Sequence, residues 1–162
     1  MYWLCVLFVA VETIYGFFWA IPNIAVRLGV WPREIYPSLY EIIPTLSFGQ
    51  EAVFFLHVVL NAVALVMLLR HWRLAIPVFV AAFVLGRIDW ILLGLNPLSY
   101  IRNQSVDDVI SFIANFGGIG LMGILQLLAI ILMGMMLQNG QLAKRGDGYW
   151  PWQAMPPASA RR

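Results

Sequence analysis

Four long apolar stretches constrain this chain more than any other feature of its sequence. They cover approximately residues 3–21, 51–70, 74–95 and 109–137. Each reaches the roughly 20 residues that a helix needs to cross a bilayer. Charged residues make up only 11% of the chain, against about 25% in soluble domains. We therefore predict an all-α integral membrane protein, built as a left-handed four-helix bundle.

Prolines are predicted to end two of these spans. Pro22 follows the first span and Asn96-Pro97 follows the third, and a proline interrupts a helix because it lacks a backbone N–H. The first stretch has no basic region before it, and Glu12 interrupts its apolar run. We therefore expect a retained membrane span and not a cleaved signal peptide.

The connection between the first two spans, residues 23–50, shows helical periodicity. Apolar side chains recur there at intervals of three and four residues, while Pro37 and Pro44 prevent one continuous helix. We expect one or two short interfacial helices, lying in the outer membrane surface. An irregular surface loop is the alternative.

The segment after the last span, residues 138–162, has a different composition. It is rich in proline, glycine and small residues, a composition that favours an extended segment. We expect a cytoplasmic tail whose aromatic residues Tyr149, Trp150 and Trp152 lie on the membrane surface or on a partner.

Basic residues in the loops predict the orientation. With four spans, both termini share one side with the short connection between the second and third spans. That side carries six Lys and Arg residues, against three on the other. Because cytoplasmic loops are enriched in Lys and Arg, both termini should be cytoplasmic. We expect the chain to lie in the inner (plasma) membrane of a bacterium.

The stretch GRIDW, residues 86–90, places two charges inside the third span. A charge at the centre of a bilayer costs roughly 2.5–3.5 kcal/mol on insertion scales, so it normally faces the bundle interior. Arg87 and Asp89 are two residues apart, which on a helix turns them about 200° from each other. Each is therefore expected to find its partner on another helix.

A helix rises about 1.5 Å per residue, so counting residues along each span gives the depth of its polar residues in the membrane. By this count the polar residues lie at two depths. The middle level holds Glu12, Asn61 and Arg87, and the outer level holds His57, Asp89 and Asn115. We expect Arg87 to interact with Glu12 and Asp89 with His57.

Two functions fit these six residues. In the first, they bind or transform a lipophilic molecule: a histidine beside an aspartate can transfer protons, and an arginine can hold an anionic or carbonyl group. In the second, they join the helices of a non-catalytic accessory subunit in a larger membrane complex, and the polar core is closed and self-satisfied. The sequence identifies no catalytic residue and leaves open whether the protein is an enzyme.

Four glycines in the last span are predicted to serve helix packing: Gly117, Gly118, Gly120 and Gly123. Part of this run matches G-x-G-x-x-G, but it has no preceding strand and no suitably placed acid, so we do not expect nucleotide binding.

With one cysteine, Cys5, and no metal-ligand spacing, we expect no metal and no cofactor. The expected partners are membrane lipids and either further copies of the chain or a larger membrane complex. The small net charge of +2 gives no indication of nucleic-acid binding.

Short motifs of the chain resemble two known membrane families. EAVFFL at Glu51 and FVLGRIDW at Arg87 resemble the MAPEG enzymes of eicosanoid and glutathione metabolism, which would imply a glutathione-linked activity. The chain departs from that family in PTLSFGQ before Glu51 and in Trp90 after the arginine. WPREIYP and HWRLAIP are similar to the sterol-isomerase and sigma-2-receptor group, whose membrane acids have no counterpart here.

Overall fold

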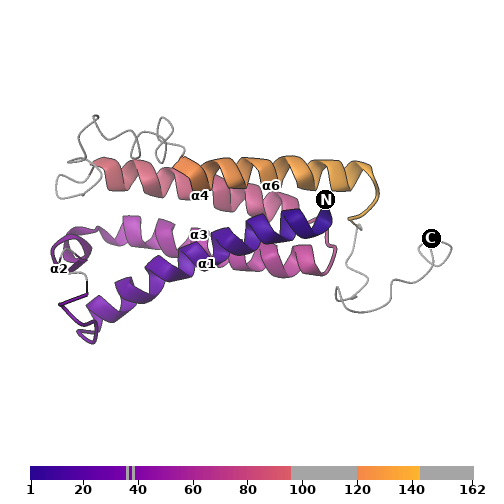
Figure 1. Ribbon diagram of the computed structural model, residues 1–162. Coiled ribbons are helices and arrows are strands. Elements are labelled where there is room, and N and C mark those ends of the chain that lie inside the picture. The colour runs from indigo at the N-terminus through magenta and orange to yellow at the C-terminus, as the bar shows by residue number, and fades with distance from the viewer. Residues whose placement is uncertain (36, 38, 96–119, 143–162) are drawn as a thin grey trace.

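The computed structural model describes residues 1–35, 37, 39–95 and 120–142, and over these ranges it contains helices and no strand (Figure 1). The elements are α1 (Tyr2–Arg27), α2 (Leu39–Ile42), the 3-10 helix η1 (Ile43–Thr45), α3 (Phe48–Leu69), α4 (Ala75–Leu95) and α6 (Gly120–Gln138). The four long helices α1, α3, α4 and α6 are each long and apolar enough to cross a membrane. Their length and composition indicate a membrane-embedded protein.

The long helices lie lengthwise beside one another (Figure 1). α1 packs against α3 and α6, and α4 packs against the same two helices. α1 and α4 are therefore diagonal to each other in the bundle, as are α3 and α6. Met1 and the turn between α3 and α4 lie at one end, the N-terminal end. α2 and η1 lie at the other, the loop end.

Proline does not end the first helix. α1 contains Pro22 in its interior and continues to Arg27, so the predicted end at Ile21 is wrong. Pro22 removes one backbone donor, but a helix packed among neighbours tolerates that loss more readily than an isolated helix does. The longer α1 carries the Arg27 side chain to the start of α3.

The remaining boundaries agree closely with the sequence prediction where the structure describes them. α3 begins at Phe48 and not at residue 51, and α4 begins at Ala75 and not at residue 74. α6 ends at Gln138, one residue after the predicted end. The predicted start of the fourth span at residue 109 and the tail beyond residue 142 lie outside the described residues. Two short helices, α2 and η1, are present in the connection where short helices were predicted.

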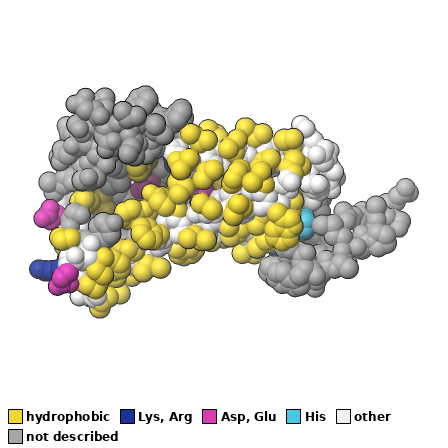
Figure 2. Space-filling view, in the orientation of Figure 1, with side chains coloured by type: hydrophobic (Ala, Val, Ile, Leu, Met, Phe, Trp, Pro, Cys, Tyr) yellow, Lys and Arg dark blue, Asp and Glu magenta, His cyan; other side chains and the backbone are white. Residues whose placement is uncertain are grey.

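Apolar side chains fill the N-terminal half of the bundle. Residues of all four long helices are buried in one cluster, among them Val9, Leu68, Phe79 and Met133. Large apolar side chains also cover the outside of the helices, while charged side chains gather at the loop end (Figure 2). A soluble monomer rarely exposes an apolar surface of this extent. This pattern agrees with a bundle that faces lipid.

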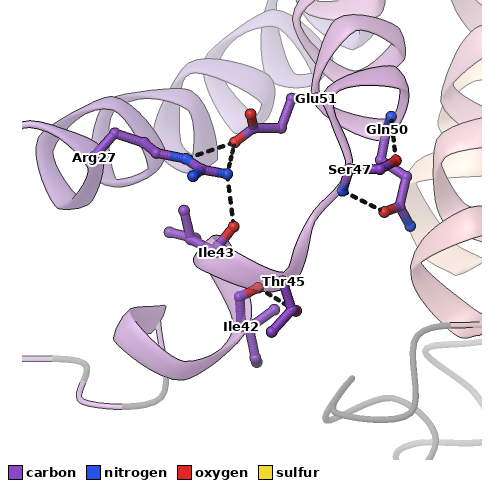
Figure 3. A network of polar contacts seen from close by, with 7 residues as sticks. All are labelled: Arg27, Ile42, Ile43, Thr45, Ser47, Gln50 and Glu51. Atoms are coloured by element: carbon purple, nitrogen blue, oxygen red, sulfur yellow. Dashed lines mark hydrogen bonds and ion pairs between the residues drawn. The ribbon is translucent and has the colours of Figure 1, made fainter.

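Polar contacts close both ends of the bundle. At the N-terminal end, the Tyr2 hydroxyl donates to the Leu68 carbonyl at 3.3 Å, and the Tyr2 ring stacks on His71. At the loop end, Arg27 donates to Glu51 at 2.7 Å and to the Ile43 carbonyl at 2.8 Å (Figure 3). These contacts join α1 to the beginning and the end of α3.

The start of α3 is capped by its own sequence. Ser47 and Gln50 form a reciprocal capping box, which satisfies backbone N–H groups that a helix start leaves free (Figure 3). The Gln50 amide also donates to the Leu92 carbonyl at 3.0 Å. The start of α3 is thereby fixed against α4.

Candidate functional site

Each long helix contributes one polar side chain to the middle of the bundle. Glu12 of α1 is 4% exposed, Asn61 of α3 is 0% exposed and Gln126 of α6 is 1% exposed. Arg87 of α4 is partly buried. Glu12 and Arg87 belong to diagonal helices, and so do Asn61 and Gln126. The four residues therefore come from all sides of the bundle.

Close contacts between the helices give the relative heights of these residues. A Cβ atom at Gly16 would lie 3.1 Å from a Val58 methyl group, so Gly16 and Val58 are level. Glu12 precedes Gly16 by four residues and Asn61 follows Val58 by three. Since α1 and α3 are antiparallel, Glu12 and Asn61 differ in height by only about 1.5 Å.

The same reasoning places Arg87 nearer the loop end. The His57 ring packs against Gly86, where a Cβ atom would lie 3.5 Å from it. Arg87 follows Gly86 directly, and Asn61 follows His57 by four residues in the opposite direction. Arg87 therefore starts about 7.5 Å from the level of Asn61, a distance that a long arginine side chain largely spans.

Gln126 lies nearer the N-terminal end. The Cys5 thiol is 3.6 Å from the Ala129 carbonyl and donates to it, so these two residues are level. Glu12 follows Cys5 by seven residues and Gln126 precedes Ala129 by three. The difference of four residues places Gln126 about 6 Å from Glu12 along the bundle axis.

These heights define a polar column through the bundle from its middle toward the loop end. In order from the N-terminal end, its members are Gln126, Glu12 and Asn61, Arg87 and His57, and Asp89.

Charge interactions connect part of the column. The Arg87 guanidinium interacts electrostatically with the Glu12 carboxyl, but no hydrogen bond or ion pair described in the structure joins the two side chains, so their predicted direct contact stays a prediction. It also interacts with Asp89. No hydrogen bond or ion pair in the described part of the chain joins Asp89 to His57, so that predicted pair also stays a prediction. Charges two residues apart on one helix interact across several ångströms even when their side chains point to different sides, which counting helical faces does not capture.

Several buried atoms of the column lack hydrogen-bond partners among the described residues. They are Glu12 Oε1, Asn61 Oδ1 and Nδ2, and Gln126 Oε1. The large majority of buried polar side-chain atoms in proteins are hydrogen-bonded. Leaving one unpaired costs about 1–3 kcal/mol. The column therefore has hydrogen-bonding capacity that the described residues do not use.

The sequence analysis did not include Gln126 in the candidate site. In the sequence Gln126 follows Asn115 by eleven residues, the spacing of about three helical turns, so this spacing could have suggested it. Asn115, Gly117 and Gly118 lie outside the described residues. Of the other predicted packing glycines, Gly120 is the first residue of α6 and Gly123 is buried.

Comparison with protein-family models, with curated proteins and with solved structures found no match to this chain. Over the residues that the structure describes, no three His, Cys, Asp or Glu side chains gather closely enough to hold a metal ion. The polar column is therefore the feature of the described residues that bears on function.

Proposed function

We propose that this protein spans the membrane and binds a lipophilic molecule, whose polar group lies in the polar column. Arg70 and Arg73 lie in the turn between α3 and α4 and support a cytoplasmic N-terminal end, because basic residues are enriched on the cytoplasmic side. The column then lies in the outer half of the bilayer, and α2 and η1 lie at the outer surface. The inner membrane of a bacterium is the proposed location.

The observation that carries this proposal is the state of Asn61. Its side chain is 0% exposed, yet neither its amide oxygen nor its amide nitrogen has a hydrogen-bond partner among the described residues. In hydrocarbon no solvent can supply the missing partners. A bound molecule with a polar group would satisfy both atoms.

The accessory-subunit function predicts a polar core whose side chains satisfy one another. The unpartnered atoms of Glu12, Asn61 and Gln126 argue against such a closed core. The proposal is limited to binding, because no hydrogen bond among the described residues joins Asp89 to His57 in the acid–base pair that a proton-transfer reaction would use.

Native mass spectrometry of the chain, extracted in mild detergent from its own membranes, tests the proposal. We expect the wild type to retain one dominant lipophilic molecule and the near-isosteric variant Asn61→Leu to lose it. The matched control is Thr13→Val, because Thr13 is buried on α1 but its hydroxyl already donates to the Val9 carbonyl at 2.8 Å. The control should retain the molecule.

Two results would overturn the proposal. Equal retention by Asn61→Leu and wild type would show that the molecule does not bind in the column. Stoichiometric partner proteins without any retained small molecule would support the accessory-subunit function instead.

A further inference from the structure

The unpartnered atoms of the column are mostly acceptors. Glu12 Oε1, Asn61 Oδ1 and Gln126 Oε1 are oxygens that can each accept a hydrogen bond, whereas Asn61 Nδ2 is the one amide nitrogen among the unpartnered atoms of the described residues. We infer that the bound molecule presents a hydrogen-bond donor, a hydroxyl or an amino group, to at least one of these three oxygens. This inference rests on the proposed function.

The three side chains come from helices that pack together and lie at neighbouring heights in the bundle. Glu12 and Asn61 are nearly level, and Gln126 lies about 6 Å away along the axis. α1, which carries Glu12, packs against both α3 and α6, which carry the other two residues. A hydroxyl group can donate to one of the oxygens while it accepts from the Asn61 amide.

A head group that only accepts hydrogen bonds fits the column poorly. A ketone, an ester or an ether could pair with the Asn61 nitrogen but would leave all three oxygens without a donor. Each oxygen left in that state costs about 1–3 kcal/mol. Arg87 does not change this balance, because its charge already interacts with Glu12 and Asp89.

An acidic head group also fits poorly. The column holds two carboxyl groups, Glu12 and Asp89, and Arg87 is the one basic side chain near both of them in the described part of the column. A third carboxylate would add like charge in a medium of low dielectric constant, where repulsion is strong. A neutral hydroxyl adds no charge, and a protonated amine adds one of opposite sign.

A matched ligand series tests the inference on the purified, delipidated full chain. Hexadecanol, hexadecylamine, hexadecyl methyl ether and palmitate have the same alkyl chain and differ in the head group. We expect the alcohol, the amine or both to raise the Tm in a saturable way. The ether and palmitate should bind at least about tenfold more weakly than the alcohol or the amine. A buried oxygen left without a donor accounts for a difference of this size. Comparing the alcohol with the amine identifies which donor the column accepts.

Variants connect the effect to the column. Gln126→Met keeps the size and removes the acceptor, so it should reduce the preference for the alcohol over the ether. Thr13→Val should leave that preference unchanged.

Three outcomes are decisive and separate the inference from the proposed function. If the ether binds as tightly as the alcohol and both require Asn61, the donor inference fails while lipophile binding stands. If none of the four probes binds but the native protein retains a lipophile, the inference fails in the same way. If no probe binds and no lipophile is retained, both proposals fail.

Discussion

Two polar regions of this molecule contrast with each other: the loop-end network of Arg27, Ile43 and Glu51, and the polar column. In the network, the Arg27 and Glu51 side chains are 41% and 19% exposed. Arg27 nevertheless donates to Glu51 at 3.0 Å and 2.7 Å and to the Ile43 carbonyl at 2.8 Å. In the column, Asn61 is fully buried and both of its amide atoms lack partners among the described residues.

This contrast is the reverse of what stability alone would favour. Exposed charges lose little when they are unpaired, because water solvates them, whereas buried polar groups lose the full solvation energy. We therefore interpret the loop-end network as a structural contact that holds the end of α1 against the start of α3. The column keeps hydrogen-bonding capacity where keeping it is costly, which fits a region that receives another molecule.

The largest expected effect comes from removing the charge that the column shares. Arg87→Leu leaves Glu12 and Asp89 without their basic neighbour. Because Arg87 is only partly buried, the loss of stability should approach but not exceed the about 3–5 kcal/mol that breaking a fully buried ion pair costs. Adding Glu12→Leu removes one of the two uncompensated carboxyls and should recover a large part of the loss. Unfolding in mixed micelles, followed by circular dichroism, measures both variants.

A double variant no more stable than Arg87→Leu alone would contradict the interaction between Glu12 and Arg87. The matched control for Arg87→Leu is Arg73→Leu, because Arg73 is exposed in the turn between α3 and α4. That change should have little effect on unfolding.

An effect of intermediate size, and of opposite sign, is expected at Asn61. In the ligand-free chain, Asn61→Leu replaces an unpaired buried amide by an apolar group of similar size. It should stabilise the chain by about 1–3 kcal/mol while it abolishes binding. Thr13→Val removes a hydroxyl that has its partner, so it should not stabilise the chain. If Asn61→Leu destabilises the ligand-free chain, then Asn61 has a partner within the protein and the contrast between the two regions disappears.

The sequence was sufficient to predict the four long helices where the structure describes them, because their apolar stretches are long and uniform. It failed at Pro22, because whether a helix tolerates a proline depends on the packing of its neighbours and not on the local sequence. The short helices α2 and η1 were predicted from periodicity, although where they lie relative to a membrane surface stays a prediction.

The column was predicted only in part, for a geometric reason. Residue counting places Cα atoms, and it correctly placed Glu12 level with Asn61. It could not say that the Arg87 side chain interacts with Asp89 on its own helix. The spacing from Asn115 could have suggested Gln126, but counting residues does not tell which face of α6 is turned toward α1.

The smallest expected effect is at the loop-end network. Arg27→Gln and Glu51→Gln, singly and together, form a double-mutant cycle for the ion pair. Because the pair is partly exposed, its coupling energy should be about 0.2–1 kcal/mol. The coupling energy should fall further at 1 M salt, because the Debye screening length shortens to about 3 Å there. Neither variant should alter retention of a lipophilic molecule. A coupling energy as large as that between Glu12 and Arg87, or one insensitive to salt, would contradict the contrast. The loop-end network would then behave energetically like a buried charge interaction of the column.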